Sequence, residues 1–421
     1  ALGLNALGAS TTGCNNVAIG ELALGTADVT GRDNIALGTA ANEDATSGSY
    51  GVVIGFQAAR QGTTGSYSIA LGAHSMEGGI TTGIANIGIG ISAVNDVTSG
   101  ACNVGIGRSA MAGVTTGCSN VGIGGCALGG AGVLTGSFNV GIGTNALDAL
   151  TSGSCNFEIG ANAMGAATTG SLNVAIGSLA LGSGALTGND NIALGTVAGN
   201  SLTSGKCNFA VGVSALNLST TGCHNIAIGD VAMGTCVMVG NENIAIGRNV
   251  FCRQIGGEHN VGLGACAGIN SAGGNDLVLI GNRAGANPEM NVTGNCTNVI
   301  MLGNNSTADF QTTAALSVTS DGRDKTDITD LDLGLDYIKA LRPVYYRWDK
   351  RSWYEDAATP IGTAEELETY LAYEPDGSNK RMRWEIGLLA QEVLAAEKLH
   401  TSNTQVLNEG MDIVALSLIH I

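Results

Sequence analysis

A five-residue phrase recurs through the first three quarters of this chain. It consists of Asn, an aliphatic residue, Ala or Gly, Ile or Leu, and Gly, as in Asn16-Val-Ala-Ile-Gly20 and Asn173-Val-Ala-Ile-Gly177. The step between copies is 17 or 18 residues almost throughout, and the copies begin at positions 16, 34, 51, 68, 86, 103, 120, 139, 156, 173, 191, 208, 225, 243 and 260, with two longer copies at 276 and 298. Such a fixed short period predicts one structural unit stacked on itself, not a globular enzyme with a single pocket.

The phrase has the alternation of a short β-strand. The Val and Ile positions share one face, and the Ala or Gly position takes the other, with Val53 and Glu158 as exceptions. We expect the aliphatic face to fill the inside of the coil, and the small face, as at Gly122 and Ala175, to pack against other chains. The Gly that ends each phrase is expected to have a positive φ in a turn.

The remainder of each rung predicts how the coil closes. A second apolar segment, such as Leu22-Ala-Leu24, precedes a corner of the Thr-Thr-Gly or Thr-Ser-Gly type. About 17 rungs of two short strands and two corners therefore predict a mainly β fold, a parallel β-solenoid or β-roll. Asn at the same place on every rung predicts a ladder of amide hydrogen bonds. The corners also recur every third rung, which indicates either a three-rung functional unit or simple duplication.

Composition divides the chain near residue 310. Residues 1–310 hold 16 acidic and 7 basic residues, whereas residues 311–421 hold 19 acidic and 11 basic residues and all three Trp. No basic stripe favours nucleic-acid binding, and no apolar run is long enough to insert into a membrane. Most of the 11 Cys lie just before the Asn of a phrase, without the spacing of a zinc site. We interpret them as fillers of a small buried position, with a metal site or a disulfide ladder as alternatives, and we expect no metal and no cofactor.

The repeats resemble the head domain of trimeric autotransporter adhesins, whose Ala-Ile-Gly phrases build a left-handed roll in a bundle of three chains. The resemblance covers most of residues 1–303 and implies a homotrimer. The longer step and the Thr-Thr-Gly corners depart from that pattern, so the handedness of the coil stays open.

The region after Phe310 changes in style. A charged segment, Ser320-Asp-Gly-Arg-Asp-Lys325, leads into an apolar pattern over 332–341 that predicts a short helix. Residues 344–348 read as a strand, and residues 384–393 as a second helix, after a loop of about 35 residues. A small α+β domain is therefore expected here.

This order resembles the endosialidase-type intramolecular chaperone, the self-cleaving C-terminal domain of phage tail fibres and tailspikes. The matching stretches are Ser320-Asp-x-Arg-x-Lys325, residues 335–344 with Tyr346 and Trp348, and residues 386–393. The resemblance implies that the domain trimerises, directs folding of the fibre and then cuts itself off. It also implies that Ser320 is the nucleophile, that Lys325 is the base, and that the bond between Thr319 and Ser320 is cleaved.

The chemistry requires such a pair, because a serine hydroxyl is a poor nucleophile until a base takes its proton. Lysine acts as a base only when it is neutral, which requires desolvation or nearby positive charge. A spacing of five residues does not suit one helix face, so the pair is expected on a loop or an extended segment. The plainer interpretation is that Ser320 caps a turn and Lys325 is a solvated surface charge; the flanking matches favour self-cleavage.

These observations predict four segments. Residues 1–310 are the solenoid shaft, 311–319 a linker, 320–415 the chaperone domain, and 416–421 residues that read like a translated sequencing adapter. Because Ala1 already lies inside a repeat, we expect the native chain to extend further, and the same holds for the helix that begins near Asp412.

The function that fits best is a phage tail fibre protein for host attachment, a homotrimer that is assembled in the host cytoplasm and located in the virion tail. Its expected partner is a receptor on the host surface, a glycan or an outer-membrane component. The alternatives are a trimeric autotransporter-like adhesin of the bacterial surface, a purely structural filament and an ice-binding repeat protein. Apart from single-turnover self-cleavage, we expect no enzyme activity in the shaft, since its acidic residues do not gather in one groove.

Overall fold

A computed structural model describes residues 1–304, except for 80, 131–132, 272 and 287–295. In the C-terminal part it describes residues 339–347, 349, 374–380, 382, 384–387, 389 and 392. The chain divides into two compact units, residues 1–304 and residues 305–421.

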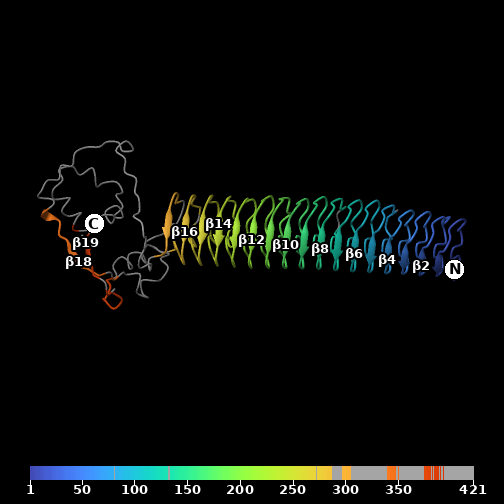
Figure 1. The fold of residues 1–421 in the computed structure, drawn as a ribbon, viewed down its shortest axis with the longest axis horizontal. Helices are drawn as coiled ribbons and strands as arrows, with labels where there is room; N and C mark the ends of the chain where they lie inside the picture. Colours follow the sequence, from blue (N-terminus) through green and yellow to red (C-terminus); the bar gives the residue numbers. More distant parts are fainter. Residues whose placement is uncertain are drawn as a thin grey trace, which may run out of the picture. The chain divides into compact units, whose positions relative to one another are not determined.

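The first unit is a parallel β-solenoid, which confirms the fold predicted from the repeat (Figure 1). Each strand pairs in parallel with the strands of the rungs before and after it, so that Ala175 lies opposite Ala193 and Val174 opposite Ile192. The seventeen strands are β1 (Val17–Ile19), β2 (Ile35–Leu37), β3 (Val52–Ile54), β4 (Ile69–Leu71), β5 (Ile87–Ile89), β6 (Val104–Ile106), β7 (Val121–Ile123), β8 (Val140–Ile142), β9 (Phe157–Ile159), β10 (Val174–Ile176), β11 (Ile192–Leu194), β12 (Phe209–Val211), β13 (Ile226–Ile228), β14 (Ile244–Ile246), β15 (Val261–Leu263), β16 (Val278–Ile280) and β17 (Ile300–Leu302).

Each rung has one strand of three residues, not the two strands that the sequence predicted. The second apolar segment instead forms turns, in which Leu179 and Leu181 adopt φ values of 57° and 51°. These left-handed conformations cost conformational energy, but they direct the backbone toward the next rung. The amide of Leu181 then donates to the carbonyl of Ala198 at 2.9 Å, so the coil closes through turns that are hydrogen-bonded between rungs.

The Gly that ends each strand has a positive φ, as expected. Gly177 has a φ of 135°, and a Cβ placed on it would lie 2.5 Å from the carbonyl oxygen of Gly195. The position therefore excludes side chains for two reasons, the backbone conformation and the close approach of the neighbouring rung.

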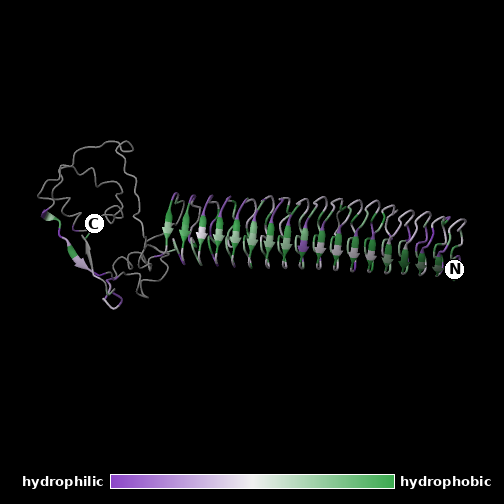
Figure 2. Ribbon diagram, in the orientation of Figure 1, coloured by the Kyte–Doolittle hydropathy of each residue, from purple (hydrophilic) through white to green (hydrophobic). Residues whose placement is uncertain are grey.

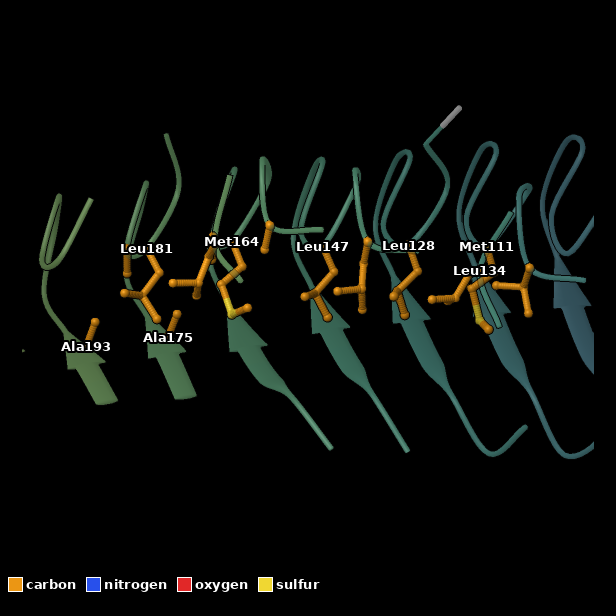
Figure 3. Packing of buried hydrophobic residues seen from close by; sticks show 14 of the residues in the cluster. Met111, Leu128, Leu134, Leu147, Met164, Ala175, Leu181 and Ala193 are labelled. Atoms are coloured by element: carbon orange, nitrogen blue, oxygen red, sulfur yellow. The ribbon is translucent and has the colours of Figure 1, made fainter. Parts of the chain in front are cut away.

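The interior of the solenoid contradicts the predicted assignment of faces. The Ala or Gly at the centre of the strand points inward, and Ala175 is 0% exposed, whereas Val and Ile point outward. The core opposite these small residues comes from the turns, where Met111, Leu147, Met164 and Leu181 point toward the strands (Figure 3). Because these large side chains occupy a narrow coil, only a small residue fits at the centre of the strand. At Gly122, for example, a Cβ would lie 2.6 Å from Cγ of Met111.

The outward side chains of the strands form a continuous apolar surface. We call it the strand face and define it as the first and third residues of β1 to β17. Every one of these positions holds Val, Ile, Leu or Phe, and all those positions are exposed or half-buried. Figure 2 shows the hydrophobic colouring of the successive strand arrows along the shaft.

The three-rung period of the sequence has a counterpart in rung length. The first residues of β1, β2, β3 and β4 are Val17, Ile35, Val52 and Ile69, so one step of 18 residues is followed by two steps of 17. The extra residue of the long rung falls at its corner, because Thr26 pairs with Glu43 while Gly31 pairs with Thr46. The same alternation begins again at β4, β7, β10 and β13, with two extra residues after β7.

The described part of the second unit contains a two-stranded antiparallel sheet. Its strands are β18 (Val344–Tyr346) and β19 (Glu385–Gly387), with Val344 opposite Gly387. The strand predicted over 344–348 is thus present over its first three residues. The helix predicted over 384–393 is wrong at its start, where β19 lies, although residue 392 is helical. Of the helix predicted over 332–341, residues 339 and 340 are described and are helical.

Candidate functional site

A ladder of buried Asn side chains runs along the inside of the shaft, as the sequence predicted. Asn173 is typical of the ladder: its Nδ2 donates to Oδ1 of Asn156 at 3.3 Å and to the carbonyl of Gly188 at 3.1 Å. Its Oδ1 accepts from the backbone amide of Asn191 at 2.9 Å and from Nδ2 of Asn191 at 3.1 Å. Each side chain thereby joins three rungs and satisfies a corner carbonyl. The uninterrupted ladder consists of Asn86, Asn103, Asn120, Asn139, Asn156, Asn173, Asn191, Asn208, Asn225, Asn243 and Asn260.

The ladder is interrupted at two rungs near the N-terminal end, where Gly51 and Ser68 take the place of Asn. The amide of Gly51 still donates to Oδ1 of Asn34 at 2.9 Å, and Oγ of Ser68 accepts from the amide of Asn86 at 3.3 Å. Neither residue has an amide side chain that could reach a corner carbonyl. A cavity of about 30 Å³ lies at this interruption, lined in part by these residues and Gly65. That volume is sufficient for a water molecule.

Restoring the ladder should stabilise the shaft. At Gly51→Asn and Ser68→Asn together, we expect the free energy of unfolding to rise by about 1–3 kcal/mol, because new amide hydrogen bonds replace a cavity. Gly51 does not have a positive φ, and a Cβ there would lie 3.2 Å from Oδ1 of Asn34, so a small shift accommodates it. Chemical denaturation measures the effect. The matched control is Gly51→Ala with Ser68→Ala, which changes the backbone equally but adds no amide; an equal gain in the control would contradict the explanation.

One carboxyl group lies inside the shaft. Glu158 occupies the central position of β9, in register with Gly141 and Ala175 on the neighbouring rungs, and it is 0% exposed. Neither carboxyl oxygen makes a hydrogen bond of normal geometry. Burial raises the pKa of Glu158 well above its usual value, and the nearby backbone of Ala175 opposes this shift only in part. The neutral form therefore fits the interior better than the charged form.

Glu158 should make the stability of the shaft dependent on pH. Because its pKa is higher in the folded chain, stability is greatest below the unfolded value of about 4.5 and falls as the pH rises from there toward the folded pKa. We expect Glu158→Ala to raise the free energy of unfolding at pH 7 by about 1–3 kcal/mol, with a smaller gain near pH 4.5. Denaturation curves at several pH values test this, with the exposed Glu21→Ala as control. An unchanged pH profile in Glu158→Ala would contradict it.

The cysteines do not fill a buried position, contrary to the sequence-based interpretation. All eleven are free thiols, and only Cys252 is buried. Cys102 and Cys155 directly precede a ladder Asn, with φ values of 59° and 60°. Since the Asn side chain points inward, the residue before it points outward, and both of these thiols are exposed. They belong to the rungs of β6 and β9, so they do not stack on adjacent rungs. Among the described residues, no group of His, Cys, Asp and Glu could hold a metal ion.

In the second unit, two of the segments that carry the resemblance to the chaperone family lie together. Besides the pairing of β18 with β19, Nε of Arg342 donates to Oε2 of Glu392 at 3.1 Å. The guanidinium of Arg347 lies over the ring of Trp384, 4.8 Å from its centroid. The hydrogen bond and the charge of Glu392 raise the pKa of Arg342. Because these side chains are exposed, such contacts align the segments more than they stabilise them.

The residues predicted to carry self-cleavage, Thr319, Ser320 and Lys325, lie outside the described residues, as does the segment 416–421. Their roles therefore stay predictions from the sequence. The functional features that the sequence missed are Glu158 as a buried acid and the strand face. The first could have been found from its place in an otherwise small, apolar column; the second required knowledge of which face points inward.

Comparison with known proteins identifies one region. Residues 320–400 match the Peptidase_S74 family model, described as chaperone of endosialidase. This match supports the resemblance of the C-terminal region, and such a domain indicates a trimeric protein of the tail fibre or tailspike type with an intramolecular chaperone. No curated protein and no solved structure matches the chain. Within the part of the chain that the structure describes, no helix has the length and apolar character needed to cross a membrane.

Proposed function

We propose that this chain is the shaft and C-terminal chaperone of a homotrimeric phage tail fibre, which attaches to the host surface. The observation that carries the proposal is the match of residues 320–400 to the endosialidase chaperone, directly after a regular solenoid of seventeen strands. A long shaft suits a protein that holds a receptor-binding surface away from a particle. The chaperone match favours this function over an autotransporter-like adhesin, for which no feature of the described residues speaks specifically.

A shaft of this kind needs a device that sets its register. Successive rungs have nearly the same strand sequence and the same ladder, so a pairing between chains that is shifted by whole rungs loses little energy locally. A folded domain that brings three C-termini together fixes the register before the shafts assemble. After its removal, the assembled shaft would be held by a kinetic barrier to unfolding.

Self-cleavage follows from the predicted pair. Oγ of Ser320 attacks the carbonyl carbon of Thr319 while neutral Lys325 accepts the hydroxyl proton. The C–N bond between Thr319 and Ser320 then breaks as the amine of Ser320 gains a proton, which leaves an ester between the two residues. Water hydrolyses this ester to a carboxylate on Thr319 and a free hydroxyl on Ser320. The reaction runs once per chain, because the nucleophile leaves with the released domain; a cut after Ser320 is the alternative position.

The trimer is tested on the chain expressed within its native reading frame. Multi-angle light scattering over a range of concentrations should give the mass of three copies. A stable monomer at micromolar concentration would refute the proposed assembly, whatever the outcome for cleavage.

A further inference from the structure

We propose that the strand face is the surface through which the three copies of the shaft pack together. The inference rests on the homotrimer proposed above and names the interface. It reverses the expectation from the sequence, in which Ala and Gly at the centre of the strands would meet the other chains. Those residues, such as Ala175 and Gly122, are enclosed in the coil and cannot contact another copy.

The first observation is the exposure of the strand face. Ile19, Ile54 and Ile89 are 44%, 40% and 36% exposed, although each lies in a regular strand of the sheet. No polar residue interrupts the face from β1 to β17. With rungs about 4.8 Å apart, the face is about 75 Å long. An uninterrupted apolar surface of this length is far larger than the patches that soluble monomers leave in water.

The second observation is the contrast with the other exposed positions of the same rungs. The position after the strand Gly holds Ile91 and Val213, but also Arg108 and Asp230. The position before the ladder Asn is equally mixed, and its exposed His259 lies between Glu242 and Asp276, at 3.5 and 3.4 Å from their carboxylates. These mixed positions are typical of a surface that faces water. Only the strand face excludes charge on every rung.

The geometry of the face points to copies of this chain as its occupant. A partner must offer apolar side chains at the same spacing along about 75 Å, and a parallel solenoid of the same rise meets that condition at every rung. The face has two columns of side chains, those of Val17 and of Ile19, on one flat strand. If the first column of one copy packs against the second column of the next, the contact is head-to-tail and closes into a ring, here of three.

The central test uses charge on the strand face. Ile89→Lys combined with Val211→Lys places three copies of each lysine at the interface, and like charges that are buried together strongly disfavour association. We expect the trimer to dissociate at concentrations on the order of 100-fold higher than the parent, or more. The matched control is Ile91→Lys combined with Val213→Lys, in which the same residue types two positions further along carry the same charge outside the strand face. The control should remain a trimer.

A second measurement on the unchanged protein covers the case in which the lysine variant fails to fold. Carbene labelling read out by mass spectrometry should modify the side chain of Ile91 several-fold more than that of Ile89 after allowance for their exposures of 55% and 36% in the single chain. Labelling in proportion to those exposures, in a protein that is a trimer by light scattering, would overturn this interface but leave the proposed function standing. A monomeric parent would instead refute the homotrimer, and with it this inference.

Discussion

Replacing Ser320 by Ala is expected to leave the chain whole, whereas the parent chain yields a fragment that begins at Ser320. The loss should be complete, because no other group can supply the attacking oxygen in the proposed acyl shift. Lys325→Ala should also remain whole, since the hydroxyl then lacks its base. Intact mass spectrometry and denaturing gels of the protein expressed in its native reading frame measure both the cut and its position.

A folding defect must be separated from a chemical one in this experiment. Ser320→Ala should still assemble into trimers by light scattering, because the methyl group removes only the nucleophile. Asp324→Ala serves as a control within the same charged segment, as neither the proposed nucleophile nor the base is changed. If Ser320→Ala is cut as fast as the parent, the assignment of the nucleophile is wrong.

Asn173→Ala is expected to have the largest effect on the stability of the shaft. It removes the donor to the carbonyl of Gly188 and the acceptor for the backbone and side-chain amides of Asn191, all of them in the interior. Each buried polar group that loses its partner costs about 1–3 kcal/mol, so we expect a loss of about 3–5 kcal/mol. Chemical denaturation gives the free energy, and hydrogen exchange should show lost protection at Asn191.

The neighbouring residue provides the control for this substitution. Leu172 directly precedes Asn173 and is 54% exposed, so Leu172→Ala should change the stability only slightly. A loss of similar size at both positions would mean that the ladder does not stabilise the shaft specifically. The chain itself shows how the ladder ends: Leu277 follows Asn260 in the same column, and only its backbone amide donates to Oδ1 of Asn260.

The tail shows where sequence patterns are weakest. The apolar spacing of residues 384–393 predicted a helix from its first residue, yet Glu385–Gly387 forms β19 against β18. A three-residue strand is set by its partner, which lies about 40 residues earlier, and no local pattern reports that pairing. Helical spacing is informative only over longer windows, and residue 392, further along, is helical.

Several features of the shaft follow from the sequence alone. The step of 17 or 18 residues determines one rung, and the phrase around Asn173 determines a strand that ends at Gly177. The amide of Asn at one fixed position is sufficient to predict the ladder, because parallel rungs in register must place equal side chains one above another. The resemblance of residues 320–325 and the following segments is likewise a property of the sequence.

Only the tertiary structure decided which strand face lies inside. Alternation separates Val and Ile from Ala without saying which side is enclosed, and burial of the larger side chains is the usual outcome. Here the turns deliver Leu147, Met164 and Leu181 into the coil first, so the remaining space admits only Ala or Gly from the strand. The position of the turns depends on left-handed Leu residues and on hydrogen bonds between rungs, which no single rung specifies. The large aliphatic side chains are therefore displaced to the outer surface, where they await a partner that the sequence of one chain does not reveal.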